Sequence, residues 1–170
     1  APERTLCGEA SVFYLYSGQA VPAILNVNPQ AKFIVMLRNP VDMAISLHLQ
    51  EIKSRHETYA CFADAWAAQD RREQGQDIPK YCMDSDILIY RSSCALGTQV
   101  QNLLLQVSRE QCMIILQEDF KQDPLGTYRQ VLSFLGLKDD GREEFPVVNP
   151  TSAHMSPLLA KRLAKIRHYH

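Results

Sequence analysis

The sequence predicts an α/β fold in which a mostly parallel sheet is flanked by helices. Two short, unbroken apolar runs, at residues 33–37 and 112–116, are typical of buried parallel strands that are covered on both faces. Segments with helical periodicity precede, separate and follow the two runs, which is the pattern of β-α-β units. Because parallel sheets normally contain more than two strands, we expect this sheet to be incomplete at its N-terminal side.

The first half of the chain contains clear signals for a strand and two helices. After a short strand expected at residues 5–7, a helix is predicted at 19–28, with Pro22 in its first turn. The next helix, at 40–53, begins with Pro40 at the first helical position. Its core-facing stripe is predicted to contain Val41, Ile45, His48 and Ile52.

Further helices are predicted in the second half of the chain. One of them is expected to be interrupted or loosened near Gly97, and another ends at Gly136, a residue suited to the end of a helix. These later helices span residues 62–74, 92–107, 123–135 and 158–167, with loops at 75–86 and 141–157.

Composition limits the classes of protein to consider. The 170 residues suffice for one domain, 1–170, and 46% hydrophobic with 22% charged residues is typical of a soluble globular protein. The net charge of −1 indicates no nucleic-acid partner, and no apolar run is long enough to span a bilayer. The five cysteines are scattered without CxxC spacing, so we expect no metal site, no disulfide framework and a reducing, cytoplasmic location. The chain begins at Ala1 rather than Met, and we expect it to be a fragment.

The segment KFIVMLRNPVDMAIS contains the strongest candidate binding site. Its apolar run ends at Arg38, Asn39 precedes a helix, and Ser46 lies about two turns inside that helix. A cation at a strand end, free amides at a helix start and a nearby hydroxyl together could bind a phosphate. Ser46 lies roughly 140° around the helix from Val41, so packing does not require it. The alternative is an ordinary strand-to-helix turn that Asn39 caps.

The sequence RNPVDMAIS resembles the 3′-phosphate-binding segment of sulfotransferases, enzymes that use 3′-phosphoadenosine 5′-phosphosulfate (PAPS). In that family an Arg and a Ser eight positions later hold the 3′-phosphate, which implies cofactor-binding roles for Arg38 and Ser46. The resemblance extends in order over residues 5–137, through LCGEAS, LGTQV and CMIILQEDFKQDPLGTYRQVLSFLGL. It implies a P-loop-NTPase-like parallel sheet and a reaction that needs no metal.

Two departures from the family pattern affect the expected site. No GxxKxGT-like loop for the 5′-phosphosulfate occurs in the 170 residues, and the C-terminal basic, glycine-containing nucleotide loop is not recognisable. We therefore expect half of a nucleotide site. The acidic pair Glu118 and Asp119 could suggest metal or acid–base chemistry, but the resemblance implies a structural turn, with Asp119 or Asp123 as a cap.

The leading interpretation is transfer of a sulfuryl group from PAPS to a hydroxyl or amine of a small-molecule or carbohydrate acceptor. Glu9, at a predicted strand end, is the candidate catalytic base, and an ordinary surface role is its alternative. His48 falls on the core stripe and is expected to be a packed histidine. Two other functions remain open: a catalytically inactive nucleotide-binding module, and a P-loop-type kinase in which Arg38 serves ATP.

Overall fold

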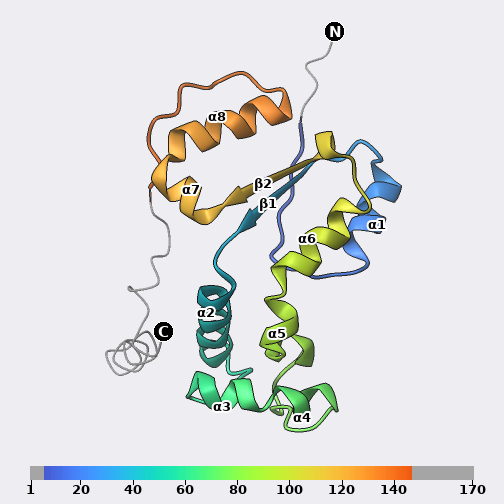
Figure 1. Ribbon diagram of the computed structural model, residues 1–170, viewed down its shortest axis with the longest axis vertical. Helices are drawn as coiled ribbons and strands as arrows, with labels where there is room; N and C mark the ends of the chain where they lie inside the picture. The colour runs from blue at the N-terminus through green and yellow to red at the C-terminus, as the bar shows by residue number, and fades with distance from the viewer. Residues whose placement is uncertain (1–5, 147–170) are drawn as a thin grey trace.

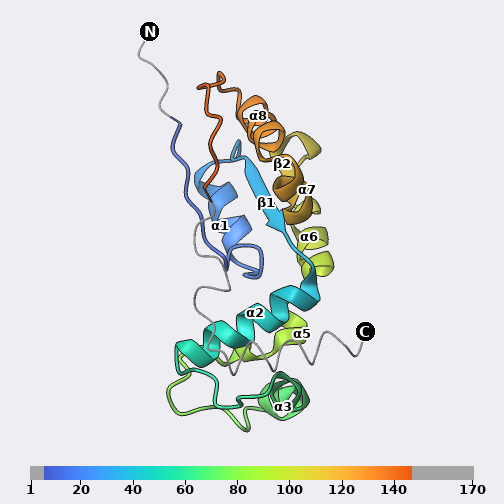
Figure 2. The ribbon, with the colours of Figure 1, turned by 90° about the vertical axis from the view of Figure 1, so that its left-hand side faces the viewer.

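A computed structural model describes residues 6–146 of the chain. The described part is elongated, with the strands and the helices that cover them at one end and a second group of helices at the other (Figures 1 and 2). The predicted helix at 158–167 and most of the predicted loop at 141–157 lie outside the described residues.

The strands β1 (Phe33–Leu37) and β2 (Cys112–Leu116) form a parallel pair. Phe33 lies opposite Cys112 and Leu37 opposite Leu116, so both strands end at the same edge of the sheet. This arrangement confirms the predicted α/β class with a parallel sheet flanked by helices. The chain continues from that edge into Arg38, which places the candidate site at the carboxyl end of the sheet, where ligands bind in this class of fold.

Helices cover the sheet unequally. The helices α1 (Ala20–Val27) and α6 (Leu96–Leu104) contribute to one core, and α8 (Pro124–Leu135) packs against β2 beside the short α7 (Gln117–Gln122) (Figure 1). The expectation that both faces of β1 are covered is wrong, because Ile34 and Met36 are 38% and 57% exposed. Alternate residues of a strand point to opposite faces, so one face of β1 lacks a covering layer in the described chain. The main core residues are Val21, Val35, Leu103, Val107 and Cys112.

The ends of α8 follow the local signals in the sequence. The Asp123 side chain accepts a hydrogen bond from the Gly126 amide at 2.8 Å, which confirms Asp123 as the cap. Gly136 adopts the left-handed conformation with φ of 75° and ends the helix as predicted. A short 3₁₀ turn, η2 (Arg109–Gln111), leads into β2.

The second group of helices surrounds its own core. It comprises α2 (Pro40–Lys53), α3 (Phe62–Ala67), α4 (Gln69–Glu73), the 3₁₀ turn η1 (Ser85–Leu88) and α5 (Tyr90–Ser93). The bounds of α2 are those predicted, but its buried residues are Ala44, His48 and Glu51, and Val41 is 55% exposed. Of the predicted stripe, His48 is confirmed and Ile45 and Ile52 are half-buried, whereas Val41 is wrong. The buried face is centred elsewhere because α2 packs against α5 and α3 rather than along the sheet.

Two other sequence predictions were also wrong. Of the strand predicted at 5–7, the described residues 6 and 7 form no strand, because β1 pairs with β2 alone in the described chain. The helix predicted at 62–74 is broken at Ala68, which is completely buried. The helix predicted at 92–107 is interrupted near Gly97 as expected, at residues 94–95, where the Gln99 side-chain amide donates to the carbonyls that end α5.

Candidate functional site

Arg38 lies directly after β1, at the carboxyl end of the sheet. Its Nε is buried and has no hydrogen-bond partner among residues 6–146, and its guanidinium forms no ion pair there. Leaving a buried donor unsatisfied costs about 1–3 kcal/mol, and more for a charged group. Such an atom in a native fold calls for an explanation, and a bound anion would provide one.

The start of α2 differs from the predicted receptor. The Asn39 Oδ1 accepts hydrogen bonds from the Val41 amide at 2.9 Å and from the Asp42 amide at 3.4 Å. The Met43 amide donates to the Asn39 carbonyl at 2.9 Å, and Pro40 has no N–H. The expectation of free helix-start amides was therefore wrong, and the Asn39 cap is confirmed. The cap accounts for the turn but leaves the Nε of Arg38 without a partner among residues 6–146.

Ser46 is half-buried on α2, and its hydroxyl makes no hydrogen bond within the described part of the chain. It lies about 9 Å along the helix axis from Pro40. No hydrogen bond joins Ser46 to Arg38 among the described residues, so the structure brings neither side chain to the other as a hydrogen-bond partner.

Glu9 lies in the N-terminal segment that precedes α1. It is exposed in an irregular segment and accepts a hydrogen bond from the Tyr14 hydroxyl. That hydrogen bond raises the pKa of Tyr14 above its ordinary value. Within residues 6–146 no hydrogen bond or ion pair links Glu9 to Arg38 or Ser46.

A buried ionic network below α2 was missed in the sequence. The side chains of Glu57 and Arg72 are both completely buried, and Arg72 donates from Nη1 and Nη2 to the two carboxylate oxygens at 2.7 and 2.8 Å. The Tyr90 hydroxyl donates to the same carboxylate at 2.8 Å, as do the amides of Thr58 and Tyr59. Arg72 lies three residues after Gln69, so helical spacing places the two side chains on one face of a helix. Only the structure shows that this face is buried.

Glu57 is held in its charged form by these donors. Burial raises the pKa of Glu57, but hydrogen bonds from Arg72, Tyr59 and Tyr90 together with the Arg72 charge outweigh burial and hold it below its ordinary value. The network thus joins the loop after α2 to α4 and to the start of α5.

His48 lies beside this network and is 2% exposed. Its Nε2–H donates to the Tyr59 carbonyl at 2.9 Å, and its ring packs edge-on against Phe62 and Tyr90. Burial lowers the pKa of His48, so the ring remains neutral in the folded protein near neutral pH. The prediction of a packed histidine is confirmed.

The end of α5 reaches the neighbourhood of Arg38. Burial raises the pKa of the Cys94 thiol to about 11, and the nearby Arg38 guanidinium acts in the opposite direction. Cys94 shares a buried cluster with Ala44 of α2 and with Tyr90. α5 therefore packs against the half of α2 that follows Arg38, and these helices lie side by side in Figures 1 and 2.

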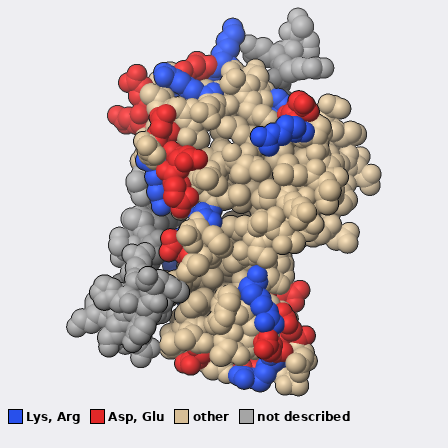
Figure 3. All heavy atoms as spheres, viewed as in Figure 1, with Lys and Arg blue, Asp and Glu red and all other residues tan. Residues whose placement is uncertain are grey.

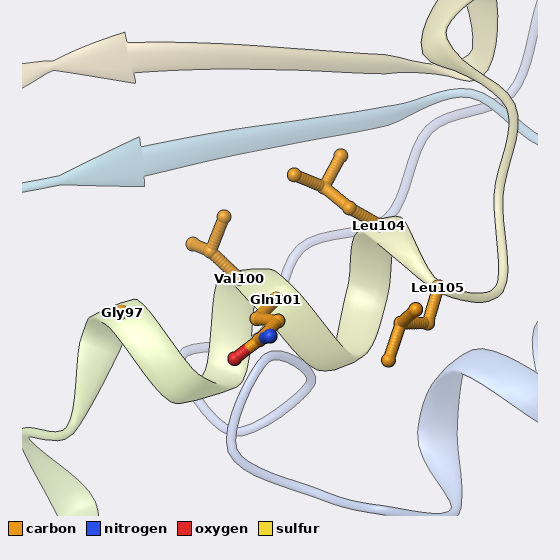
Figure 4. Close-up of a pocket in the computed structure, with 5 residues that line it drawn as sticks. All are labelled: Gly97, Val100, Gln101, Leu104 and Leu105. Carbon is orange, nitrogen blue, oxygen red and sulfur yellow. The ribbon is translucent and has the colours of Figure 1, made fainter.

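A shallow hollow on α6 is a different feature. In Figure 4, Val100 and Leu104 point from α6 toward the strands and Leu105 points away from them. The hollow is lined by Gly97, Val100, Gln101, Leu104 and Leu105, so it offers no charged side chain to a phosphate. Arg38, Ser46 and Glu9 do not line it.

The charged surface does not point to a polyanionic partner. On the face drawn in Figure 3, Lys and Arg side chains are interspersed with Asp and Glu and form no continuous basic surface.

No group of His, Cys, Asp and Glu among residues 6–146 is arranged to hold a metal ion, and Glu118 and Asp119 are exposed on α7. All five cysteines are free. The described helices include none with the length and apolarity needed to cross a membrane.

Comparison with known proteins identifies the family. The model of the sulfotransferase family matches residues 14–141. The crystal structure of a sulfotransferase from Alicyclobacillus acidocaldarius aligns with a TM-score of 0.66 and 33% sequence identity. That alignment covers 94% of this chain and 59% of the other, and no curated protein matches the sequence. The family match covers most of the chain and includes β1, Arg38, α2 and β2, so the chain belongs to the sulfotransferase family.

Proposed function

We propose that Arg38 and Ser46 bind the 3′-phosphate of PAPS, and that the chain forms part of an enzyme that transfers the sulfuryl group to a hydroxyl or amine. The observation that carries this proposal is the buried Nε of Arg38, which has no partner among residues 6–146 and follows a strand end. An arginine guanidinium matches a phosphate because it can donate two parallel hydrogen bonds.

The proposed phosphate lies along the flank of α2, between the guanidinium and the Ser46 hydroxyl. The first amides of α2 are used by Asn39, so the helix contributes through its dipole while the two side chains supply the hydrogen bonds. The charged bond is expected to contribute more than the hydroxyl, because hydrogen bonds to charged groups are stronger than neutral ones.

In the proposed reaction, an acceptor oxygen or nitrogen attacks the sulfur in line with the bond to the leaving phosphate. A new bond to sulfur forms, the bond from sulfur to the phosphate oxygen breaks, and a base removes the acceptor proton. Glu9 is the proposed base, and a cytoplasmic small molecule or carbohydrate is the proposed acceptor. The 3′-phosphate is remote from the sulfur, so Arg38 and Ser46 serve binding and orientation.

Calorimetry tests the binding step with 3′-phosphoadenosine 5′-phosphate (PAP), the product nucleotide, and with ATP. Arg38→Ala should weaken PAP binding by about 1.5–3 kcal/mol, and Ser46→Ala by about 0.5–1.5 kcal/mol. Arg129→Ala is the matched control, because Arg129 is exposed on α8 and pairs with Asp139. The assignment is wrong if the wild-type chain binds neither nucleotide, or if Arg38→Ala leaves PAP affinity unchanged.

An inactive nucleotide-binding module is the second candidate function. The 170 residues contain no GxxKxGT-like loop, so sulfuryl transfer by this chain has to be tested separately from nucleotide binding. Such a module would bind PAP but would transfer no labelled sulfuryl group from PAPS to hydroxyl or amine acceptors. A preference for ATP over PAP would instead support the kinase alternative, which the family match does not favour.

A further inference from the structure

We propose that Tyr90 is a positioning residue for the 3′-phosphate site, because its hydroxyl fixes α5 against α2, the helix that follows Arg38 and carries Ser46. This inference rests on the proposed function of Arg38. It assigns a role in nucleotide binding to a buried network that contacts no nucleotide itself.

Tyr90 is anchored through its hydroxyl group. Its side chain is completely buried, and its hydroxyl donates to the Glu57 carboxylate at 2.8 Å. Glu57 is fixed to the end of α2, because its amide donates to the Glu51 carbonyl at 3.1 Å. Arg72 holds the same carboxylate with two hydrogen bonds, so the acceptor for Tyr90 has one orientation.

α5 connects Tyr90 to the helix that follows Arg38. Tyr90 is the first residue of α5, and Cys94 directly follows this single-turn helix. Cys94 and Ala44 belong to the same buried cluster as Tyr90, which joins α5 to the half of α2 that follows Arg38. A shift of α5 would therefore move the half of α2 that follows Arg38.

The buried Glu57–Arg72 pair is better suited to orienting α5 than to stabilising the fold. A buried ion pair is a weak source of net stability, since desolvation offsets much of its attraction, and an orienting role is the better-supported use of such groups in some proteins. α5 is too short to be stable as an isolated helix, so its placement depends on tertiary contacts. A fixed hydroxyl at its first residue is suited to setting that placement.

The experiment is a double-mutant cycle measured by calorimetry with PAP, on the full chain at a temperature where every variant is folded. Tyr90→Phe removes the hydroxyl and keeps the ring, and it is combined with Arg38→Ala. Tyr81→Phe is the matched control, because Tyr81 is 72% exposed. We expect Tyr90→Phe to weaken PAP binding about threefold to tenfold in the wild-type background and to have no effect beside Arg38→Ala.

The outcomes separate this inference from the proposed function. If wild-type protein binds PAP through Arg38 but Tyr90→Phe lowers only the melting temperature, the positioning role is refuted and the 3′-phosphate site stands. An equal loss in both backgrounds also refutes it, since the effect would not pass through Arg38. If the wild-type chain does not bind PAP, the proposed function itself fails.

Discussion

Glu57→Gln replaces the carboxylate at the centre of the buried network with an amide of the same shape. The carboxylate accepts from five donors: Nη1 and Nη2 of Arg72, the Tyr90 hydroxyl, and the amides of Thr58 and Tyr59. A glutamine oxygen at the Oε1 position keeps the two backbone amides and one guanidinium bond. Its NH₂ group then faces the second guanidinium N–H, and two donors cannot bond to each other.

The magnitude follows from burial. Arg72 is 2% exposed, so the variant leaves a buried guanidinium without its counter-charge. Breaking a buried pair in this way costs about 3–5 kcal/mol, a large part of the 5–15 kcal/mol that stabilises a typical domain. Glu73→Gln makes the same chemical change in the Glu73–Arg91 pair, whose side chains are 44% and 42% exposed. Solvent screening limits that cost to about 0–1 kcal/mol.

Urea unfolding followed by circular dichroism, at pH 7 and 25 °C, measures both variants against the wild type. Because the folded pKa of Glu57 lies below its ordinary value of 4.5, its stabilisation is complete above that pH and is lost as the pH falls through the folded pKa. Glu57→Gln should therefore also flatten the acid limb of the stability curve. A cost for Glu57→Gln no larger than that for Glu73→Gln would refute the argument, since the pair would then behave as a solvated one.

Two further predictions concern stability. Burial lowers the pKa of His48 from 6.5, so the unfolded chain binds a proton more readily than the folded protein, and stability should fall as the pH drops below about 6.5. Urea titrations of His48→Gln, whose amide can still donate to the Tyr59 carbonyl, should show a flatter dependence of stability on pH. An unchanged pH dependence would contradict a buried neutral ring. Gly97→Ala should stabilise the protein by about 0.5–1 kcal/mol, because Gly97 is helical and has open space for a Cβ. Gly136→Ala should destabilise it by about 1 kcal/mol, because φ is 75° at Gly136. Melting temperatures that shift in the same direction for both variants would contradict these two backbone conformations.

Local signals predicted the elements closest to the candidate site. The apolar run of β1, the Asn39 cap and Pro40 define a strand, a turn and a helix within a short segment, and the bounds of β1 and α2 agree with the prediction. The same applies to α8, where Asp123 and Gly136 determine the two ends. Each of these features depends on backbone chemistry within a few residues, so a single sequence contains the information.

The features that depend on distant residues were not predicted. Glu57 and Arg72 come together only because a loop and a helix fold onto α5, and no local pattern relates Glu57 to Tyr90. The inward face of α2 was also misassigned in part, because an apolar stripe predicts burial only of apolar side chains. Glu51 is buried although it is charged: its carboxylate bonds to the His56 ring, and its carbonyl accepts from the amides of His56 and Glu57. In the candidate site, the identity of Arg38 was visible in the sequence, but only the structure shows that its buried Nε has no partner within residues 6–146.

The capped start of α2 changes how such a phosphate site must work. A site made of backbone amides is fixed by the helix that carries it, and its geometry is as rigid as the helix itself. Here Asn39 occupies those amides, so the proposed recognition would depend on a long, flexible guanidinium and a single hydroxyl. A flexible cation binds well only when its surroundings limit the orientations that it can adopt, since each lost rotamer otherwise reduces affinity. The buried Glu57–Arg72–Tyr90 network fixes α5 against the half of α2 that follows Arg38, which is why we assign its effect to nucleotide affinity and not to stability alone.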